Sequence, residues 1–386
     1  MKSVCILGGL GHIGLPLGIL LASKDLNVTL LDLNLEHKEL VLKGKLPFIE
    51  YDAEELLGEV LKKGNLSITN SYDSIKNKDF IIVCIGTPVD EYMSPKIKPF
   101  LNCIEQISKH SDQQSCIVIR SSIYPGLFNR VEEIFNGNGI TKVSYCPERI
   151  VQGYAIRELS KLPQIVASND LEAKKLSKEL FLKITNDIID SDIKEAELSK
   201  LFSNAWRYIQ FATSNQFAMI AKDYGCSYQS IHNIMTTGYE RNRDLPKAGF
   251  AAGPCLLKDT MQLFSFYGNS FFIGQAAMNI NEGYPLFIVE KYLKNYNLVD
   301  LNIGILGMAF KPSVDDIRDS LSFRLKKILE ARGSKVFCSD EYYKREDWFS
   351  PQKLIEMCEI IIVAVPHPEY VNIDFKNKET INVWSC

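Results

Sequence analysis

A cysteine, a lysine and an aspartate lie close together in the stretch AGFAAGPCLLKDT, residues 248–260. Cys255 follows Gly253 and Pro254, and Asp259 comes four residues after the cysteine, one helical turn further on. Proline is favoured at the first position of a helix, so the sequence predicts a helix that starts at Pro254 with Cys255 in its first turn. There the helix dipole stabilises a thiolate. A thiolate beside a carboxylate is suited to covalent catalysis at a carbonyl carbon.

A second group of polar residues shares one face of a predicted long helix, in the stretch AELSKLFSNAWRY. Lys200 and Asn204 are four residues apart, and Glu197 lies one turn earlier. An ammonium and an amide aligned in this way can donate hydrogen bonds to a developing oxyanion. The ordinary alternatives are a solvated lysine–glutamate pair here and a solvated Lys258 and Asp259 beside a buried cysteine in the first stretch. Spacing alone leaves both alternatives open.

A glycine-rich turn, GGLGHIGLPLG, follows the first predicted strand and opens a predicted helix. Gly9, Gly11 and Gly14 fit the pattern G-x-G-x-x-G, which serves a tight turn, a close approach of a pyrophosphate and helix packing. Asp32 ends the second predicted strand, where it would bind the adenosine ribose and repel a 2′-phosphate. Together these features predict an NAD site. The alternative is a plain turn with a solvated aspartate.

The composition favours a cytoplasmic α/β enzyme. The chain has 386 residues, of which 46% are hydrophobic and 24% charged, and its net charge is −3. This gives no electrostatic case for a nucleic-acid or membrane partner, and neither a membrane span nor a signal peptide is recognisable. The ten cysteines form no CxxC pair and the five histidines are isolated, so we expect reduced thiols and no metal.

The elements that must position these residues form two α/β regions around a helical centre. Short apolar runs alternate with helical patterns over residues 1–190, as in a doubly wound parallel sheet. Residues 191–224 form one predicted helix of about 50 Å, whose apolar stripe predicts a homodimer or higher homo-oligomer. Helical patterns continue to residue 297. Four further predicted strands follow, without a second dinucleotide motif.

The sequence resembles a known family, the nucleotide-sugar 6-dehydrogenases, which act on UDP-glucose, GDP-mannose and UDP-N-acetylhexosamines. The resemblance rests on the order and spacing of GGLGHIGLPLG, CIGTPVD, RSSIYPG, CPERIVQG, AELSKLFSNAWRY, GFAAGPCLLKD and GMAFKPSVDDIRDS. It covers nearly the whole chain. It implies two Rossmann-like domains, an NAD-binding domain over 1–190 and a nucleotide-sugar (UDP) domain over 298–386, joined by a central helical domain over 191–297.

The family resemblance also implies an activity, a four-electron oxidation of the sugar C6 hydroxyl with two NAD+. Cys255 would form a thiohemiacetal and then a thioester with C6. Lys200 and Asn204 would stabilise oxyanions, and Asp259 would organise water and proton transfers. Glu148 matches the glutamate implicated in thioester hydrolysis.

Further contacts are implied by the same resemblance. Ser122 would place a hydroxyl beside the reacting sugar. The remaining implied cofactor contacts are Gly9, Gly11, His12, Ile13, Gly14, Asp32, Thr87, Ser122 and Arg318. The implied substrate contacts are Glu148, Arg149, Lys200, Asn204, Arg241, Gly253 and Lys311, with Arg243 as the alternative to Arg241.

The substrate is the least determined part of the interpretation. The CPERI stretch with the following EL and PQIV resembles enzymes acting on UDP-N-acetylmannosamine or UDP-N-acetylglucosamine, which make uronic acids for surface polysaccharides. UDP-glucose and GDP-mannose stay open as substrates. So do a one-step dehydrogenase of the β-hydroxyacid type and a catalytically silent nucleotide-sugar-binding protein. The chain departs from the family at Ala252 and Pro254, which stand near the cysteine, and at Gln216.

Overall fold

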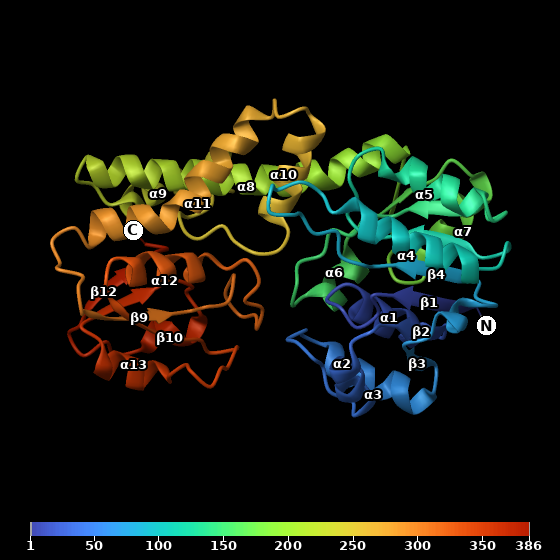
Figure 1. The fold of residues 1–386 in the computed structure, drawn as a ribbon, viewed down its shortest axis with the longest axis horizontal. Helices are drawn as coiled ribbons and strands as arrows, with labels where there is room; N and C mark the ends of the chain where they lie inside the picture. Colours follow the sequence, from blue (N-terminus) through green and yellow to red (C-terminus); the bar gives the residue numbers. More distant parts are fainter. Residues whose placement is uncertain (1, 386) are drawn as a thin grey trace. The chain divides into compact units, whose positions relative to one another are not determined.

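The computed structural model describes residues 2–385, and the chain divides into two compact units between Phe202 and Ser203. The first unit is built on an eight-stranded sheet (Figure 1). In their order across the sheet the strands are β3 (Leu66–Thr69), β2 (Asn27–Leu31), β1 (Ser3–Leu7), β4 (Phe80–Val83), β5 (Cys116–Ile119), β6 (Val143–Tyr145), β7 (Gln164–Ala167) and β8 (Ile188–Ser191).

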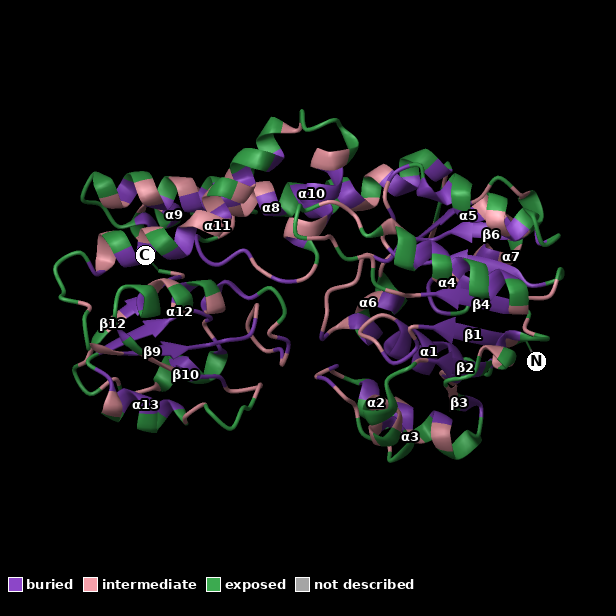
Figure 2. Cartoon of the chain, viewed as in Figure 1, coloured by how far each residue is buried: buried purple, intermediate pink, exposed green. Residues whose placement is uncertain are grey.

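Helices cover both faces of this sheet, because its central strands are apolar on both sides. Along β1, Val4 and Ile6 belong to one buried cluster, whereas Cys5 and Leu7 belong to another. Figure 2 shows the strands buried between helices whose outer faces are exposed. The helices are α1 (Gly14–Ser23), α2 (Leu35–Leu42), α3 (Ala53–Lys63), α4 (Ile97–His110), α5 (Leu127–Asn136), α6 (Ala155–Lys161) and α7 (Leu171–Phe181), with a short 3-10 turn η1 (Tyr72–Ile75).

The predicted doubly wound sheet is confirmed, with differences at its margins. β3 and β8 were not predicted, because both are short edge strands with half-buried or exposed residues and carry no continuous apolar run. β7 pairs antiparallel with β6 through Tyr145 and Ala167, while every other pair in the sheet is parallel. The carboxyl ends of the parallel strands nevertheless form one edge, where the loops after β1, β4, β5 and β6 gather.

The long predicted helix is α8 (Ile193–Asp223), which runs across the boundary between the two units. The residues expected to form its apolar stripe are mostly turned inward, since Leu201, Ala205 and Ala212 are buried. Phe202 is the exception, with a side chain that is exposed. The helix therefore has a buried stripe and, beside it, apolar side chains in contact with solvent.

The second unit combines helices with a smaller sheet. Its helices are α9 (Tyr228–Thr236), the 3-10 turn η2 (Glu240–Asn242), α10 (Leu256–Phe266), α11 (Phe272–Tyr292), α12 (Leu321–Ala331), α13 (Pro351–Met357) and the 3-10 turn η3 (Pro368–Asn372). The sheet is parallel, in the order β10 (Lys335–Ser339), β9 (Asn302–Leu306), β11 (Ile360–Val363), β12 (Glu379–Asn382).

One apolar core joins the helical part of this unit to its sheet. Tyr284 and Ile288 of α11, Ile303 of β9 and Leu325 of α12 are all buried in the same cluster. The loops that carry the predicted chemistry of this unit, before α10 and after β9, therefore rest on one common core. Within residues 2–385, no helix is both long and apolar enough to cross a membrane.

Candidate active site

In the glycine turn after β1, neighbouring atoms leave no room for a side chain at Gly9 and Gly14, whereas the space beside Gly11 is open. A Cβ on Gly9 would lie 2.7 Å from the carbonyl oxygen of Ile6, and one on Gly14 would lie 2.2 Å from that of Gly8. A Cβ on Gly11 would meet nothing closer than the Gly8 oxygen at 3.5 Å. Packing therefore demands the outer glycines, while the space at Gly11 is left for a ligand. This is the arrangement that a pyrophosphate needs.

Asp32 stands directly after β2, beside this turn. Its Oδ2 accepts a hydrogen bond from the backbone N–H of Leu10 at 2.9 Å, and Oδ1 accepts one from that of Asn34 at 3.0 Å. The carboxylate is half-buried, and each oxygen has acceptor capacity left for a ribose hydroxyl. The turn and the aspartate thus fit the adenosine and phosphate parts of NAD.

The two residues between the second and third glycines begin the first helix. Ile13 is the N-cap residue of α1. The ring of His12 lies on that of Phe48 with centroids 4.0 Å apart, and its Nε2 is 3.3 Å from Nε2 of Gln152. His12 therefore links the glycine turn to the CPERIVQG loop.

Two predicted hydroxyl residues meet at the carboxyl ends of neighbouring strands. The Thr87 hydroxyl, in the loop after β4, donates a hydrogen bond to the carbonyl oxygen of Ser122, in the loop after β5. Both residues are half-buried. The contact leaves the Ser122 hydroxyl as a separate polar group on the same edge of the sheet.

Glu148 is held by a partner that sequence reasoning missed, the guanidinium of Arg120. Arg120 is fully buried and forms an ion pair with Oε2 of Glu148, which is 4% exposed. The other carboxylate oxygen accepts the backbone N–H groups of Arg149 at 2.7 Å and Ile150 at 3.1 Å. The carboxylate is thereby fixed in orientation, with donors on both oxygens.

The Arg120 guanidinium is itself anchored on several sides. It donates to the carbonyl oxygen of Cys146 at 3.2 Å and to Oε1 of Gln164 at 3.0 Å, and it lies 4.7 Å from the ring centre of Phe181. Its position directly after the apolar run CIVI was a signal that the sequence did contain. A second predicted residue of the same loop, Arg149, donates its guanidinium to the carbonyl oxygen of Pro163 at 2.5 Å.

Cys255 is one of two exposed cysteines among the described residues, the other being Cys226. Burial raises the pKa of Cys84 and Cys146 to about 12, which keeps such thiols protonated. The predicted start of the helix at Pro254 is wrong, because α10 begins at Leu256 and Cys255 is its N-cap residue. The thiol still stands at the N-terminus of a helix, with its backbone carbonyl accepting the N–H of Asp259 at 2.9 Å.

Gly253, two residues before the cysteine, has a φ of +102°. A Cβ at this position would lie 2.5 Å from the ring of Phe310, and the Gly253 N–H donates to the carbonyl oxygen of Asp319 at 3.3 Å. Glycine is thus required here both by the backbone conformation and by the aromatic ring packed against it.

Asp259 is completely buried, so the alternative of a solvated aspartate is wrong. Its Oδ2 accepts the side-chain N–H of Asn204 at 2.5 Å, and its Oδ1 accepts the ammonium of Lys258 at 2.5 Å. Lys258 is mostly buried with it and was not predicted to be functional. A carboxylate held between an amide and an ammonium lies one turn along α10 from the thiol.

Lys200 and Asn204 lie one turn apart on α8, as predicted. The alternative of a solvated pair of Lys200 with Glu197 is wrong, because Glu197 is buried and accepts the N–H groups of Gly126 at 2.8 Å and Phe128 at 3.1 Å. Burial raises the pKa of Glu197, although these two backbone hydrogen bonds oppose the shift. Glu197 therefore fixes the start of α5 and the loop that follows Ser122.

The Arg241 and Arg243 side chains are both exposed in the segment around η2. Arg241 donates to the Tyr239 hydroxyl at 3.3 Å, and Arg243 pairs with Glu240 at 3.2 Å. The choice between them as a substrate contact stays open.

Lys311 and Arg318 lie on the segment after β9. The Lys311 ammonium is 5.7 Å from the ring centre of Phe310. The ion pair with Asp316, at 2.6 Å, raises the pKa of Arg318, and the charge of Cys255 adds to the shift. Within the second unit, the guanidinium is thus electrostatically coupled to the candidate nucleophile.

Asn215 on α8 is another residue that sequence reasoning did not single out. Its side chain accepts the N–H of Gly249 at 2.8 Å and donates to the Gly249 carbonyl oxygen at 3.0 Å, and it also bonds Oδ1 of Asn281 at 2.9 Å. All these groups are buried. They clamp the start of the loop that leads to Cys255.

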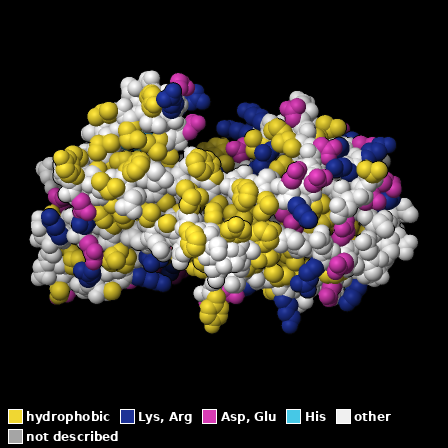
Figure 3. All heavy atoms as spheres, turned by 90° about the horizontal axis from the view of Figure 1, so that it is seen from above, with side chains coloured by type: hydrophobic (Ala, Val, Ile, Leu, Met, Phe, Trp, Pro, Cys, Tyr) yellow, Lys and Arg dark blue, Asp and Glu magenta, His cyan; other side chains and the backbone are white. Residues whose placement is uncertain are grey.

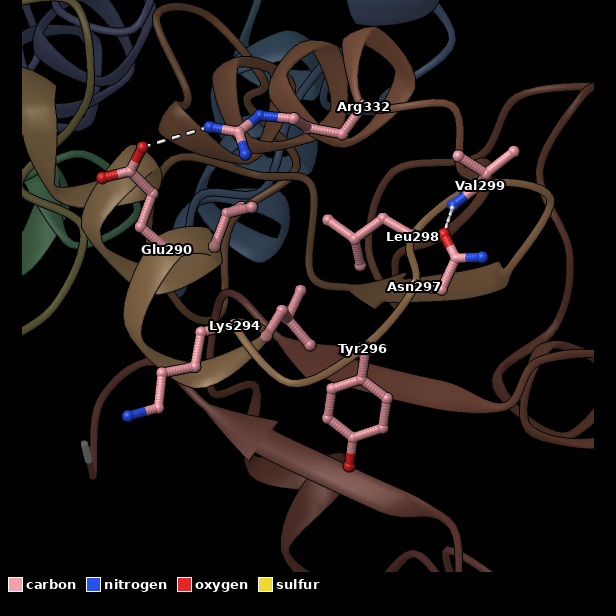
Figure 4. A pocket seen from close by; sticks show the side chains of 9 residues that line it. Glu290, Lys294, Tyr296, Asn297, Leu298, Val299 and Arg332 are labelled. Carbon is pink, nitrogen blue, oxygen red and sulfur yellow. Dashed lines mark hydrogen bonds and ion pairs between the residues drawn. The ribbon is translucent and has the colours of Figure 1, made fainter.

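A surface cavity of about 490 Å³ in the second unit is separate from this chemistry (Figure 4). It lies between the end of α11 and the segment before β9, and its polar groups are Glu290 and Arg332, which pair at 3.1 Å, together with Lys294 and Asn297. No sequence-predicted site residue lines it. Among the described residues, no group of three or more His, Cys, Asp and Glu side chains is arranged to hold a metal ion.

Three domain models of one family match successive parts of the chain. They are the NAD binding, central and UDP binding domains of the UDP-glucose/GDP-mannose dehydrogenase family, over residues 2–185, 194–283 and 304–382.

Individual relatives agree with these matches. A UDP-N-acetyl-D-mannosamine dehydrogenase of Methanocaldococcus jannaschii is 28% identical over 98% of this chain and 89% of its own length. A UDP-glucose 6-dehydrogenase of Rickettsia bellii is 24% identical over 95% and 90%. The structure of a UDP-N-acetyl-D-mannosamine dehydrogenase from Pyrococcus horikoshii superposes with a TM-score of 0.92 and 25% identity, over 99% of this chain and 95% of that one. The chain therefore belongs to the UDP-glucose/GDP-mannose dehydrogenase family of NAD-dependent oxidoreductases.

Proposed function

We propose that the chain oxidises the C6 hydroxyl of a UDP-N-acetylhexosamine to the carboxylate, with UDP-N-acetyl-D-mannosamine as the expected substrate. The names of the relatives support the substrate, and the family supports NAD as the oxidant. The observation that carries the mechanism is the buried Asp259, held by Asn204 and Lys258 one helical turn after the exposed thiol of Cys255. UDP-glucose is the second candidate, because one relative bears that name.

The chemistry of the cysteine follows from the bonds that must form and break. Bound NAD+ supplies the hydride acceptor for each of the two oxidations at C6. The Cys255 thiolate attacks the C6 aldehyde and forms a C–S bond, and the resulting alkoxide is the group that a lysine such as Lys200 stabilises. After the second oxidation the product is a thioester. Water then adds to its carbonyl carbon, the C–S bond breaks, and the thiol and the sugar carboxylate are released.

Glu148 is suited to the final hydrolysis as an acceptor. Arg120 and two backbone N–H groups fix the orientation of its carboxylate, which can accept a hydrogen bond from an attacking water. Asp259, one helical turn along α10 from Cys255, is suited to proton transfer at the thiol. Both roles are part of the proposal.

The proposal includes a homodimer or a higher homo-oligomer. Several large apolar side chains on α8 face solvent, among them Trp206, which is 60% exposed, and Ile220, which is 58% exposed. Figure 3 shows that hydrophobic side chains are exposed among the charged ones on the surface of the chain. A second copy would remove this surface from water. A monomeric mass in light scattering at micromolar concentration would contradict this part.

The cellular role proposed is that of a cytoplasmic enzyme that supplies a uronic acid for a surface polysaccharide. It rests on the substrate class, since sugar nucleotides are the activated donors from which such polymers are made.

A cysteine-to-serine pair of variants tests the mechanism. Cys255→Ser should lower turnover to the acid by about a thousandfold or more, because serine cannot form the thioester. Cys226→Ser is the matched control, an exposed cysteine of the same unit outside the proposed machinery, and should retain wild-type rates. A one-step dehydrogenase would be insensitive to both changes. A silent binding protein would form no NADH from UDP-sugars or from GDP-mannose.

A further inference from the structure

A buried histidine–aspartate pair lies at the carboxyl edge of the second sheet. Asp340 follows β10 and His367 comes shortly after β11, and the structure buries both side chains completely. Nε2 of His367 is 3.1 Å from Oδ2 of Asp340. Neither residue has a place in the proposed chemistry.

Asp340 gathers backbone N–H groups from two loops. Oδ2 accepts those of Met308 at 2.6 Å and Ala309 at 2.8 Å, directly after β9. Oδ1 accepts those of Tyr342 at 2.9 Å and Tyr343 at 3.1 Å. The carboxylate therefore ties the loop after β9 to the loop after β10.

His367 extends the same tie to the middle of the first of these loops. Its Nδ1 is 3.2 Å from the backbone nitrogen of Ser313, which can only donate, so Nδ1 accepts and Nε2 carries the proton given to Asp340. Ser313 has a φ of +59°, a conformation that residues other than glycine seldom adopt. The hydrogen bond from Ser313 to the buried ring thus holds an unfavourable backbone conformation in place.

The loop between these anchors carries two residues of interest. Lys311 is the implied substrate contact. The ring of Phe310 packs against Gly253, where it leaves no room for a Cβ, and the Phe310 N–H donates to the carbonyl oxygen of Asp316 at 2.9 Å. The loop anchored by the histidine thus reaches the turn that precedes Cys255.

We propose that His367 is a positioning residue, which acts with Asp340 and through Ser313 to hold the Met308–Ser313 loop in the conformation in which Lys311 receives the nucleotide sugar. The inference rests on the proposed function, because the contact of Lys311 with substrate is carried over from the family. His367 itself is too deeply buried to touch the substrate.

Two amide substitutions separate the two hydrogen bonds of the ring. In His367→Asn the side-chain oxygen replaces Nδ1 and still accepts from Ser313, whereas in His367→Gln the side-chain nitrogen replaces Nε2 and still donates to Asp340. We expect His367→Gln to weaken the binding of UDP by about tenfold or more, because the half-buried Ser313 loses the acceptor of this hydrogen bond and the loop loses its conformation. His367→Asn should stay within about threefold of the wild type.

The measurement is calorimetric titration of the full chain with UDP and, separately, with NAD+. The affinity for NAD+ should be the same in both variants, because the glycine turn belongs to the other unit. Equal UDP affinity in His367→Gln and the wild type would overturn the inference. A parallel loss of UDP and NAD+ binding would also overturn it. So would a loss of UDP affinity in His367→Asn well beyond threefold, a result that decides the question even if His367→Gln does not fold.

A double-variant cycle tests the route through the lysine. If His367 acts by placing Lys311, the losses of UDP affinity in His367→Gln and Lys311→Met should be clearly less than additive in the double variant. Additive losses would contradict that route. Failure of the proposed function has a different signature, in which the wild type binds UDP but oxidises no UDP-sugar. A wild type that binds NAD+ and no UDP would overturn the inference itself.

Discussion

The carboxyl edges of the two sheets are built alike in topology and differently in chemistry. In each sheet an aspartate follows the strand that pairs with the first strand of its unit, Asp32 after β2 and Asp340 after β10. Asp32 is half-buried and takes one N–H from the glycine turn, that of Leu10. Asp340 is buried, takes the N–H groups of both Met308 and Ala309, and is bound to a histidine.

The difference concerns the backbone N–H groups at the start of each edge. In the first unit the turn is open at Gly11, so a phosphate can approach the backbone. In the second unit an internal carboxylate, that of Asp340, accepts hydrogen bonds from the corresponding N–H groups. We infer that the first edge binds phosphate with its backbone, while the second presents side chains on a loop that the protein itself has ordered.

The largest effect, on stability, is expected at the buried ion pair between Arg120 and Glu148 at the edge of the first sheet. Arg120→Met leaves the carboxylate of Glu148 buried without its cation and should lower the free energy of unfolding by about 3–5 kcal/mol. Arg120→Lys keeps the positive charge, so its free energy of unfolding should fall by less than that of Arg120→Met. Urea unfolding of both variants measures the two values. An equal loss in both would mean that shape, and not the ion pair, is what Arg120 provides.

The next effect tests the open glycine. Gly11→Ala should weaken the binding of NAD+ by about tenfold or more, because the methyl group takes the space of the pyrophosphate, while the melting temperature stays unchanged. Gly58→Ala is the matched control, since nothing lies near that glycine of α3 either and it is remote from the turn. Calorimetric titration with NAD+ and thermal unfolding measure both. Unchanged NAD+ affinity in Gly11→Ala would remove the distinction between the two edges.

A smaller effect is expected at Asp32. Asp32→Asn removes the charge that repels a 2′-phosphate, so the preference for NAD+ over NADP+ should narrow by about tenfold. The ratio of kcat/KM for the two cofactors measures it. UDP affinity should not change. A ratio equal to that of the wild type would show that Asp32 does not discriminate between the two cofactors at the adenosine ribose.

The smallest effect is the loss of stability at low pH that depends on Asp340, at the edge of the second sheet. Burial by itself raises the pKa of Asp340, but the hydrogen bonds from His367 and from the backbone N–H groups outweigh it and leave the pKa below its ordinary value. Asp340 therefore stabilises the fold above the ordinary aspartate pKa, and that stability, about 1 kcal/mol, is lost as the pH falls below about 4.

Tryptophan fluorescence isolates this effect, because all three tryptophans, Trp206, Trp348 and Trp384, lie in the second unit. Urea unfolding followed by fluorescence between pH 3 and 6 should show the loss in the wild type. Asp340→Asn should have a lower free energy of unfolding than the wild type at pH 6, and that free energy should change less with pH. The same slope in both proteins would assign the acid sensitivity to another group.

The sequence predicted local features well and tertiary partners poorly. The parallel sheets, the long helix, the glycine turn and the pairing of Cys255 with Asp259 depend on residues within about a turn or a strand of one another, and spacing captures those. Pro254 was misread as the helix start, because a capping residue differs from its neighbours by backbone angles that spacing does not carry. The solvated Glu197 was wrong because its partners, Gly126 and Phe128, come from a distant loop.

The residues that were missed share that cause. The partner of Arg120 is Glu148, and the partners of His367 are Asp340 and Ser313, all far along the chain. A charged residue directly after the strand CIVI was the signal for Arg120. For His367, no spacing in the sequence points to Ser313, since the contact depends on how two loops of one sheet edge meet.

Counting the NADH formed tests whether the chain carries out a four-electron oxidation through Cys255. A limiting amount of UDP-N-acetyl-D-mannosamine is run to completion with excess NAD+, and the NADH formed is divided by the sugar consumed. The account predicts two NADH per sugar and a uronic acid product. One NADH per sugar, with an aldehyde product, would contradict it.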